Sequence, residues 1–277
     1  MRGAHRGEPA RRRPVRARGP GLARLRALVL ALVALLLAGA SLASAEVLQR
    51  GDVRITLRGS ITPTKLPRSG SAPVRVAVGT KITAMKQADP RRLTRISIAI
   101  NRYGRLDPTG LPVCTEEDIQ PATTQKALEA CRGSLVGEGS FAAVVDLDRQ
   151  ASFPSAGKLL AFAGTYEGTP AILAHIYGTE PVPTSLTLPF RITRSKGTFA
   201  TVLTARLPAS EAGYVTALSL DLHRDFSFRG ARRSYASASC PAPKGFPGAV
   251  FPFAKVSYRF AGGRAVTADL AGHCQVR

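Results

Sequence analysis

Asp221, His223 and Asp225 are the residues that the sequence best places to do chemistry. They occupy positions i, i+2 and i+4, so on an extended strand their three side chains point to the same side. Two carboxylates beside an imidazole are able to hold a divalent metal or to orient a general base. The same spacing also describes the solvated face of a strand, because Leu220 and Leu222 alternate with it on the apolar side. We therefore treat the three residues as a polar cluster and assign no catalytic residue, metal ligand or cofactor to the chain.

Asp146 and Asp148 form a second acidic pair near the end of another expected strand. Carboxylate oxygens suit calcium, but no Asx-rich loop of the required spacing surrounds this pair. A glycosidase needs only two acids that folding brings together. A secreted hydrolase acting on cell-wall or extracellular polysaccharide is therefore the alternative function, with its acids drawn from this pair and from Asp221 and Asp225.

Motifs of the serine and cysteine hydrolases are not complete in the chain. A nucleophile elbow requires G-x-S-x-G, and neither Gly133-Ser134 nor Gly139-Ser140 completes it. The absence of tryptophan also disfavours an aromatic platform for carbohydrate. The sequence thus favours a non-catalytic binding or structural module whose ligand it does not identify.

Four cysteines in an exported chain indicate two disulfides, for which three pairings exist. The local pairing, Cys114 with Cys131 and Cys240 with Cys274, is favoured because each pair brackets a compact unit. The cysteines form no C-x-x-C motif and the histidines are far apart in sequence, so no structural zinc site is expected.

Alternating apolar and polar residues predict that strands make up most of the chain. Ile96, Ile98 and Ile100 alternate with small or polar residues, as in a strand with one buried face. Val256 and Tyr258 repeat this pattern before a Gly-Gly turn, which predicts a β-hairpin. Further strands are expected over residues 53–57, 74–78, 141–147, 158–166, 171–177, 186–192, 199–205, 218–222 and 266–270.

One short helix is expected between the first two cysteines. Residues 126–131 are mostly good helix formers, and we expect the acidic run 116–118 at the N-terminus of this helix, Pro121 in its first turn and Gly133 as its stop. About ten strands with one helix predict an all-β fold, an antiparallel β-sandwich or jelly roll.

The first 45 residues have the three-part pattern of a signal peptide. Nine arginines and only Glu8 as an acid lead into the apolar run Ala27–Ala40, and small residues follow at 43–45. This predicts cleavage after Ala45 and a secreted, extracellular chain that begins at Glu46. The alternative is that the apolar segment stays in place as an anchor, because its length just suffices to span a bilayer.

The predicted mature chain consists of two parts. Residues 46–72 form a strand and a linker, because Gly59–Pro73 is rich in turn formers, and residues 73–277 form the β-sandwich domain.

Basic residues concentrate near the start of this mature chain. Of the net charge of +21, +8 belongs to the leader and +13 to the remainder. Residues 46–105 hold 13 Lys and Arg against three acids, whereas residues 106–277 hold 17 against 14. This asymmetry predicts weak attraction to anionic cell-envelope polymers or lipid surfaces; the alternative is that the charge only keeps the protein soluble. The basic residues concerned are Arg54, Arg58, Arg75, Lys81, Lys86, Arg91, Arg92, Arg95, Arg102 and Arg105.

Nucleic acid is not an expected partner. Arg229, Arg232 and Arg233 cluster beside two phenylalanines, but the leader directs the chain out of the cell. The oligomeric state does not follow from the sequence.

Two cysteine-bearing stretches resemble an uncharacterised family of secreted proteins of high-GC Gram-positive bacteria. They are GLPVC at 110–114 with LVGEGS downstream, and SYASASCPAPKGF at 234–246 with a closing cysteine. The resemblance covers most of residues 73–274. It implies a secreted, disulfide-bearing β-protein, and it implies no activity, ligand or catalytic residue.

Overall fold

The computed structural model describes residues 44–50, 53–84, 93–146, 151–179, 183–207 and 213–277. Of the predicted leader, only Ser44 and Ala45 are described, and they begin the first strand. Asp148 and the basic residues Lys86, Arg91 and Arg92 lie outside the described residues.

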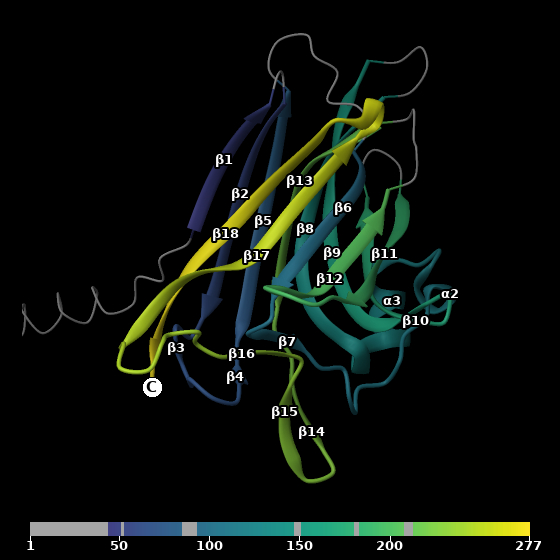
Figure 1. Ribbon diagram of the computed structural model, residues 1–277. Coiled ribbons are helices and arrows are strands. Elements are labelled where there is room, and N and C mark those ends of the chain that lie inside the picture. Colours follow the sequence, from purple (N-terminus) through teal and green to yellow (C-terminus); the bar gives the residue numbers. More distant parts are fainter. Residues whose placement is uncertain (1–43, 51–52, 85–92, 147–150, 180–182, 208–212) are drawn as a thin grey trace, which may run out of the picture. The chain divides into compact units, whose positions relative to one another are not determined.

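The all-β prediction is confirmed, and most strands belong to one large sheet (Figure 1). Neighbouring strands in it are antiparallel, except that β3 pairs with β18 in parallel. In order across the sheet the strands are β1 (Ser44–Arg50), β2 (Val53–Thr62), β5 (Arg75–Ala84), β13 (Gly213–Leu222), β8 (Leu135–Val145), β9 (Phe153–Tyr166), β10 (Thr169–Gly178), β11 (Thr184–Arg194), β12 (Phe199–Arg206), β6 (Leu93–Asn101), β17 (Gly248–Phe260), β18 (Ala265–Val276) and β3 (Lys65–Leu66).

The large sheet curls until its two ends face each other. Strand β18 lies against β1 and β2, although it is paired in the sheet with β17 and β3. Ile55 and Leu57 of β2 are fully buried in one cluster with Phe253 and Leu270 of β17 and β18. The sheet therefore encloses an interior, because its inner face is apolar and both ends of the sheet bury that face against each other.

Glycines allow strands to approach one another where the sheet bends through β13, β8, β9 and β10. A Cβ atom at Gly139 would lie 1.9 Å from the carbonyl oxygen of Ser219, and one at Gly157 would lie 2.1 Å from that of Tyr177. No real Cβ atom tolerates such distances, so only glycine fits these two positions without displacing the neighbouring strand.

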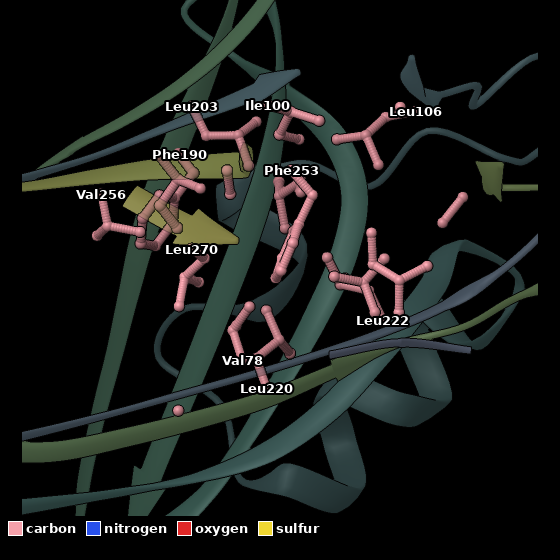
Figure 2. Close-up of a pocket in the computed structure, with 18 of the residues that line it drawn as sticks. Val78, Ile100, Leu106, Phe190, Leu203, Leu220, Leu222, Phe253, Val256 and Leu270 are labelled. Atoms are coloured by element: carbon pink, nitrogen blue, oxygen red, sulfur yellow. The ribbon is translucent and has the colours of Figure 1, made fainter. Parts of the chain in front are cut away.

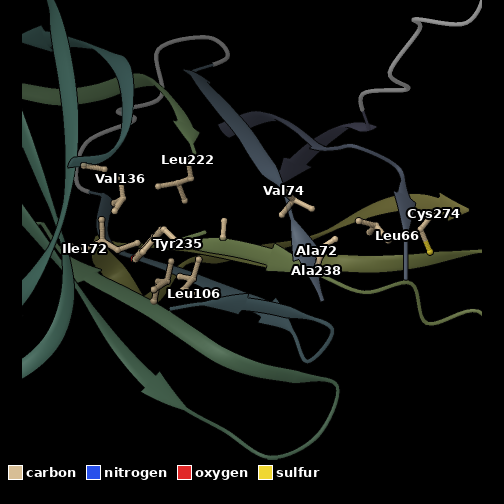
Figure 3. Close-up of a cluster of buried hydrophobic side chains, with 14 of the residues drawn as sticks. Leu66, Ala72, Val74, Leu106, Val136, Ile172, Leu222, Tyr235, Ala238 and Cys274 are labelled. Atoms are coloured by element: carbon tan, nitrogen blue, oxygen red, sulfur yellow. The ribbon is translucent and has the colours of Figure 1, made fainter. Parts of the chain in front are cut away.

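A small sheet of β4 (Ala72–Pro73), β16 (Ala236–Ala238) and β7 (Gly104–Leu106) packs into one end of this interior. Leu106 and Tyr235 contact inward-facing residues of the large sheet, including Ile172 (Figure 3). The predicted Cys240–Cys274 disulfide is present and ties this segment to β18. A hairpin of β14 (Asp225–Phe228) and β15 (Ala231–Ser234) precedes it, and a 3-10 turn (Ala261–Gly263) joins β17 to β18.

Helices cover the outer face of β9 and β10. The predicted Cys114–Cys131 disulfide closes this cover, whose helix α3 (Thr124–Cys131) confirms the expected short helix. Pro121 was expected in its first turn, but it lies between α3 and a separate short helix, α2 (Glu116–Ile119). The reason is capping: Thr115 caps α2 and Thr123 caps α3, so each segment begins its own helix.

The helical cover continues in a 3-10 turn (Arg132–Ser134) that leads into β8. Within the described residues, no helix combines the length and apolar character needed to cross a bilayer.

His175 is buried beneath this helical cover. It lies in β10 opposite Leu160 of β9 and Thr187 of β11, and its side chain is fully buried. The side chain of Gln120, from the cover, accepts a hydrogen bond from the Thr187 amide at 2.6 Å. Among the described residues, neither imidazole nitrogen has a hydrogen-bond partner, and burial lowers the pKa of His175.

Because the folded protein keeps His175 neutral, we expect stability to fall with acidification. Below pH ~6.5 the unfolded chain binds a proton that the folded chain excludes, so the free energy of unfolding decreases by up to about 1.4 kcal/mol per pH unit until the lowered pKa is reached. Urea unfolding of His175→Leu between neutral and acidic pH should show a flatter profile. The control is the exposed His223→Gln, and an equal effect of both substitutions would contradict the assignment.

Gly139→Ala should destabilise the bend of the sheet. The added methyl group would meet the Ser219 carbonyl at 1.9 Å, and overpacking of this kind costs about 1–3 kcal/mol. The matched control is Gly79→Ala, where the nearest atom would be 3.8 Å away. Urea denaturation should separate the two variants, and equal stability would show that the bend adjusts freely.

Candidate functional site

The interior of the large sheet is lined by rows of apolar side chains. Residues that pair directly in neighbouring antiparallel strands share a face, so Val78, Leu220 and Leu159 belong to one inward row across β5, β13, β8 and β9. Glycine 139 occupies the β8 position of that row. On the opposite wall, Ile98 of β6 pairs with Leu203 of β12 and with Val256 of β17.

These two walls surround a cavity of about 150 Å³. Figure 2 shows side chains from both walls, among them Val78, Leu220, Phe190 and Ile100, directed toward a common space. Val78, Leu220, Phe190, Ile98 and Ile100 are only half-buried although they point inward. The protein's own side chains therefore do not fill this part of the interior.

The cavity has the size and chemistry of an apolar ligand site. An engineered cavity of about 150 Å³ lined by Leu, Ile and Phe stays dry and binds benzene or xenon. Filling such a space is favourable because each apolar group that leaves water contributes about 0.8 kcal/mol per CH₂. The lining therefore selects an uncharged hydrocarbon or aromatic group by burial alone.

Few polar groups reach this space. Asn101 lines it, but its amide nitrogen donates to the Pro252 carbonyl at 2.7 Å and its oxygen accepts from the Tyr103 amide at 3.2 Å. The Tyr258 hydroxyl approaches the Thr80 hydroxyl without forming a well-directed hydrogen bond. These two neutral hydroxyls are able to orient a ligand within the apolar wall, and Tyr103, Arg105, Ser219 and Ser237 also contribute to the lining.

Burial holds the Tyr258 phenol in its neutral form. Burial raises the pKa of Tyr258 to about 12, and the Thr80 hydroxyl acts weakly in the opposite direction. Burial also raises the pKa of Tyr235, which packs in the cluster beneath the cavity.

We expect the protein to lose stability above pH ~10, where unfolded tyrosine loses its proton and the buried phenols keep theirs. Each buried phenol lowers the free energy of unfolding by up to about 1.4 kcal/mol per pH unit until its own raised pKa is reached. Tyr258→Phe should reduce this alkaline sensitivity in urea titrations, whereas the half-buried Tyr214→Phe should change it less. An unaltered alkaline profile in Tyr258→Phe would contradict the burial effect.

The polar cluster predicted from the sequence is divided between two strands. Strand β13 ends at Leu222 and β14 begins at Asp225, so His223 lies in the connection and the expected single strand face is wrong. Asp221 instead pairs with Arg75, with Nε 3.5 Å from Oδ1. The Nε2 atom of His223 is 3.8 Å from Oδ2 of Asp225, an exposed pair of small energetic value.

The acids proposed for a hydrolase do not all converge. The β13–β8 register places Asp146 just beyond the Val145–Gly213 pair and Asp221 opposite Glu138, eight residues further along β13. At ~3.3 Å per residue, this separates Asp146 and Asp221 by about 25 Å, whereas glycosidase acids stand roughly 5–9.5 Å apart. Asp148 lies outside the described residues.

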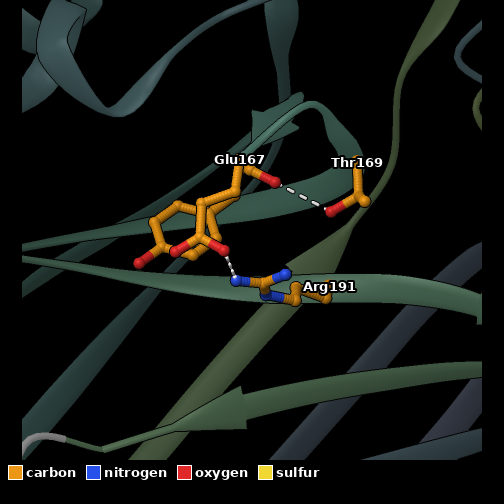
Figure 4. A network of polar contacts seen from close by, with 4 residues as sticks. Glu167, Thr169 and Arg191 are labelled. Carbon is orange, nitrogen blue, oxygen red and sulfur yellow. Dashed lines mark hydrogen bonds and ion pairs between the residues drawn. The ribbon is translucent and has the colours of Figure 1, made fainter.

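A second polar network lies on the outer surface at the β9–β10 turn. Arg191 binds Glu167 and stacks over the Tyr166 ring at 4.8 Å, and Thr169 donates to the Tyr166 carbonyl at 2.8 Å (Figure 4). The hydrogen bond from Arg191 lowers the pKa of Glu167. Since each group already has a partner, this network fixes the turn to β11.

Cys114, Asp118 and Cys131 are close enough to suggest a metal site, with ligand atoms within 4.8 Å of one another. The two sulfur atoms are bonded to each other, however, at 1.95 Å. Zinc binds deprotonated thiolates, so the oxidised protein offers only the Asp118 carboxylate here.

No protein-family model, no curated protein sequence and no solved structure matches the chain.

The sequence identified the residues of the cavity but not the cavity itself. Ile98, Ile100 and Leu220 were expected as the buried parity of strands, and they do face inward. Apolar alternation signals a face turned from water, and it is the same for a packed core and for a hollow one. The half-buried state of these residues appears only when the distance between the walls is known.

Proposed function

We propose that this protein is an exported, non-catalytic binding module that holds an uncharged apolar group inside its curled sheet. The observation that carries the proposal is the cavity of about 150 Å³, lined on both walls by inward side chains that are only half-buried. The atoms that line an empty apolar space lack dispersion contacts on the side that faces the space. A ligand that fills this space restores those contacts and gains the free energy of leaving water.

The chemistry of the lining defines the ligand class. Leu220, Ile98 and Phe190 offer no hydrogen bonds, and the hydroxyls of Thr80 and Tyr258 are neutral. A charged group placed among these residues would lose its hydration without gaining a counter-ion. The ligand is therefore a small hydrocarbon, an aromatic molecule or the apolar end of a larger molecule.

Export is supported by two independent features. The leader has the order of a signal peptide, and all four cysteines form disulfides, which persist in oxidising compartments. We place the protein outside the cell, free or peripheral to the envelope.

The alternative function, a secreted polysaccharide hydrolase, can be tested directly by substitution of its candidate acids. It would draw its acids from Asp146, Asp148, Asp221 and Asp225, and changing these to asparagine would abolish hydrolysis of wall polysaccharide without unfolding the protein. The binding proposal has the better support because Asp146 lies far from Asp221 along β13, and Asp221 pairs with Arg75 and not with another acid.

Titration with straight-chain alcohols tests the binding proposal. Each additional methylene buried in the cavity contributes ~0.8 kcal/mol, so affinity should rise about fourfold per carbon and level off when the cavity is full. Isothermal calorimetry or NMR shift changes of the interior methyl groups would measure this series. A series that shows no increase with chain length would overturn the proposal.

The double substitution Ile98→Phe with Leu220→Phe fills the cavity from opposite walls and should abolish this chain-length dependence. Val202→Phe is the matched control, because Val202 lies in β12 next to Leu203 and faces the other side of the sheet. Thermal unfolding confirms that the filled variant is folded. Binding that persists unchanged in the filled variant would place the ligand elsewhere.

A further inference from the structure

Three arginines stand side by side on the outer face of the sheet. Arg95 of β6 pairs directly with Arg206 of β12 on one side and with Arg259 of β17 on the other. Strands lie about 4.8 Å apart, so the three Cα atoms form a line roughly 10 Å long. We call Arg206, Arg95 and Arg259 the arginine row.

The arginine row is electrostatically unfavourable in the protein by itself. Like charges directly opposite each other destabilise a strand pair, and here two such pairs share Arg95. Among the described residues, none of the three guanidinium groups forms a hydrogen bond or an ion pair. Of the described acids, Glu167 binds Arg191 and is also attracted by the charge of Arg206, and Asp269 pairs with Lys255 at 3.6 Å.

A row of hydroxyl groups runs beside the arginine row on the same face. Thr204, Ser97, Ser257 and Thr267 are in register across β12, β6, β17 and β18. The Ser97 and Thr204 oxygens are 3.2 Å apart, and those of Ser257 and Thr267 are 2.9 Å apart. Hydroxyl donors next to guanidinium groups are the combination that binds phosphate oxygens.

From this geometry we propose that the arginine row is a binding site for a linear polyanion that carries phosphate groups. A line of guanidinium groups across adjacent strands matches charges repeated along a chain, and each arginine is able to donate two hydrogen bonds to one phosphate. The site is on the outer face, so it is independent of the interior cavity and of the function proposed for it.

A lipid surface fits this face less well than a polymer. Peripheral attachment to a bilayer combines basic groups with inserted apolar side chains. The large apolar side chains that are exposed among the described residues are Val47, Val113, Phe246 and Val250. Only Val250 shares a strand with the row, and it precedes Arg259 by nine residues, about 30 Å of extended chain.

Binding of inorganic polyphosphate to the purified protein tests the proposal. The triple variant Arg95→Gln, Arg206→Gln and Arg259→Gln should bind at least about tenfold more weakly than the unaltered protein. The slope of log affinity against log salt should also decrease by about two, because each phosphate contact on a single-stranded polyanion contributes ~0.7. Circular dichroism and thermal unfolding show that the variant keeps its fold.

The control variant removes the same charge from other places. Arg54→Gln, Arg58→Gln and Arg232→Gln alter exposed arginines on β2 and β15, and this variant should retain nearly all of the affinity. Equal losses in the two triple variants would mean that net charge alone attracts polyphosphate, which would overturn the site. Unchanged binding in the row variant would overturn it as well.

Vesicles that contain phosphatidylglycerol form the second arm of the experiment. They carry the same phosphate chemistry on a surface, and co-sedimentation should be weaker than polyphosphate binding and should not depend on the arginine row. If vesicle binding is lost in the row variant and polyphosphate does not bind, the proposal is wrong and the ligand of the arginine row is a membrane surface.

Discussion

The inward alternation of apolar side chains around a strongly curled sheet is the constraint on which the rest of this structure depends. Every second residue of the long strands faces the interior, and the curl brings distant strands together. Where β2 meets β17 and β18, inward side chains such as Ile55 and Leu270 touch and are fully buried. Where β5 and β13 stand opposite β6 and β12, similar side chains leave a cavity. The separation of the walls decides between core and cavity.

Two smaller units cover apolar surface that the large sheet leaves exposed: the small sheet covers one end of the interior, and the helical cover lies on the outer face. The sheet of β4, β16 and β7 fills one end and is tied to β18 by the Cys240–Cys274 disulfide. The helical cover lies on the outer face of β9 and β10, where Leu160, Phe162 and Leu173 would otherwise meet water. These strands are buried on both faces, which explains their nearly continuous apolar sequences. One disulfide belongs to each cover and stabilises it mainly by restricting the unfolded chain.

The distribution of charge depends on strand faces and not on sequence segments. Basic residues were expected to merge into a surface within residues 46–105. Arg95 belongs to that segment, but its neighbours across the sheet are Arg206 and Arg259, which come from the later part of the chain. Arg75, from the same early segment, forms an exposed ion pair with Asp221. Strand order, with β6 between β12 and β17, therefore places three arginines side by side on the outer face of the sheet.

The sequence by itself determined the all-β class, most strand positions and the short helix that forms α3, and it favoured the disulfide pairing that the structure has. Each of these follows from local information: alternation along a strand, capping, and cysteines that close short loops. Only the tertiary structure decided the functional surfaces. The cavity depends on the distance between Leu220 and the wall opposite it, and the arginine row depends on which strands are neighbours. The expected single strand face of Asp221, His223 and Asp225 was wrong for the same reason: β13 ends before His223, and Asp221 pairs with Arg75 of the neighbouring strand β5, whereas His223 and Asp225 stay close together. Pairing between strands far apart in sequence is set by the packing of the whole sheet, and no periodicity within one strand encodes it.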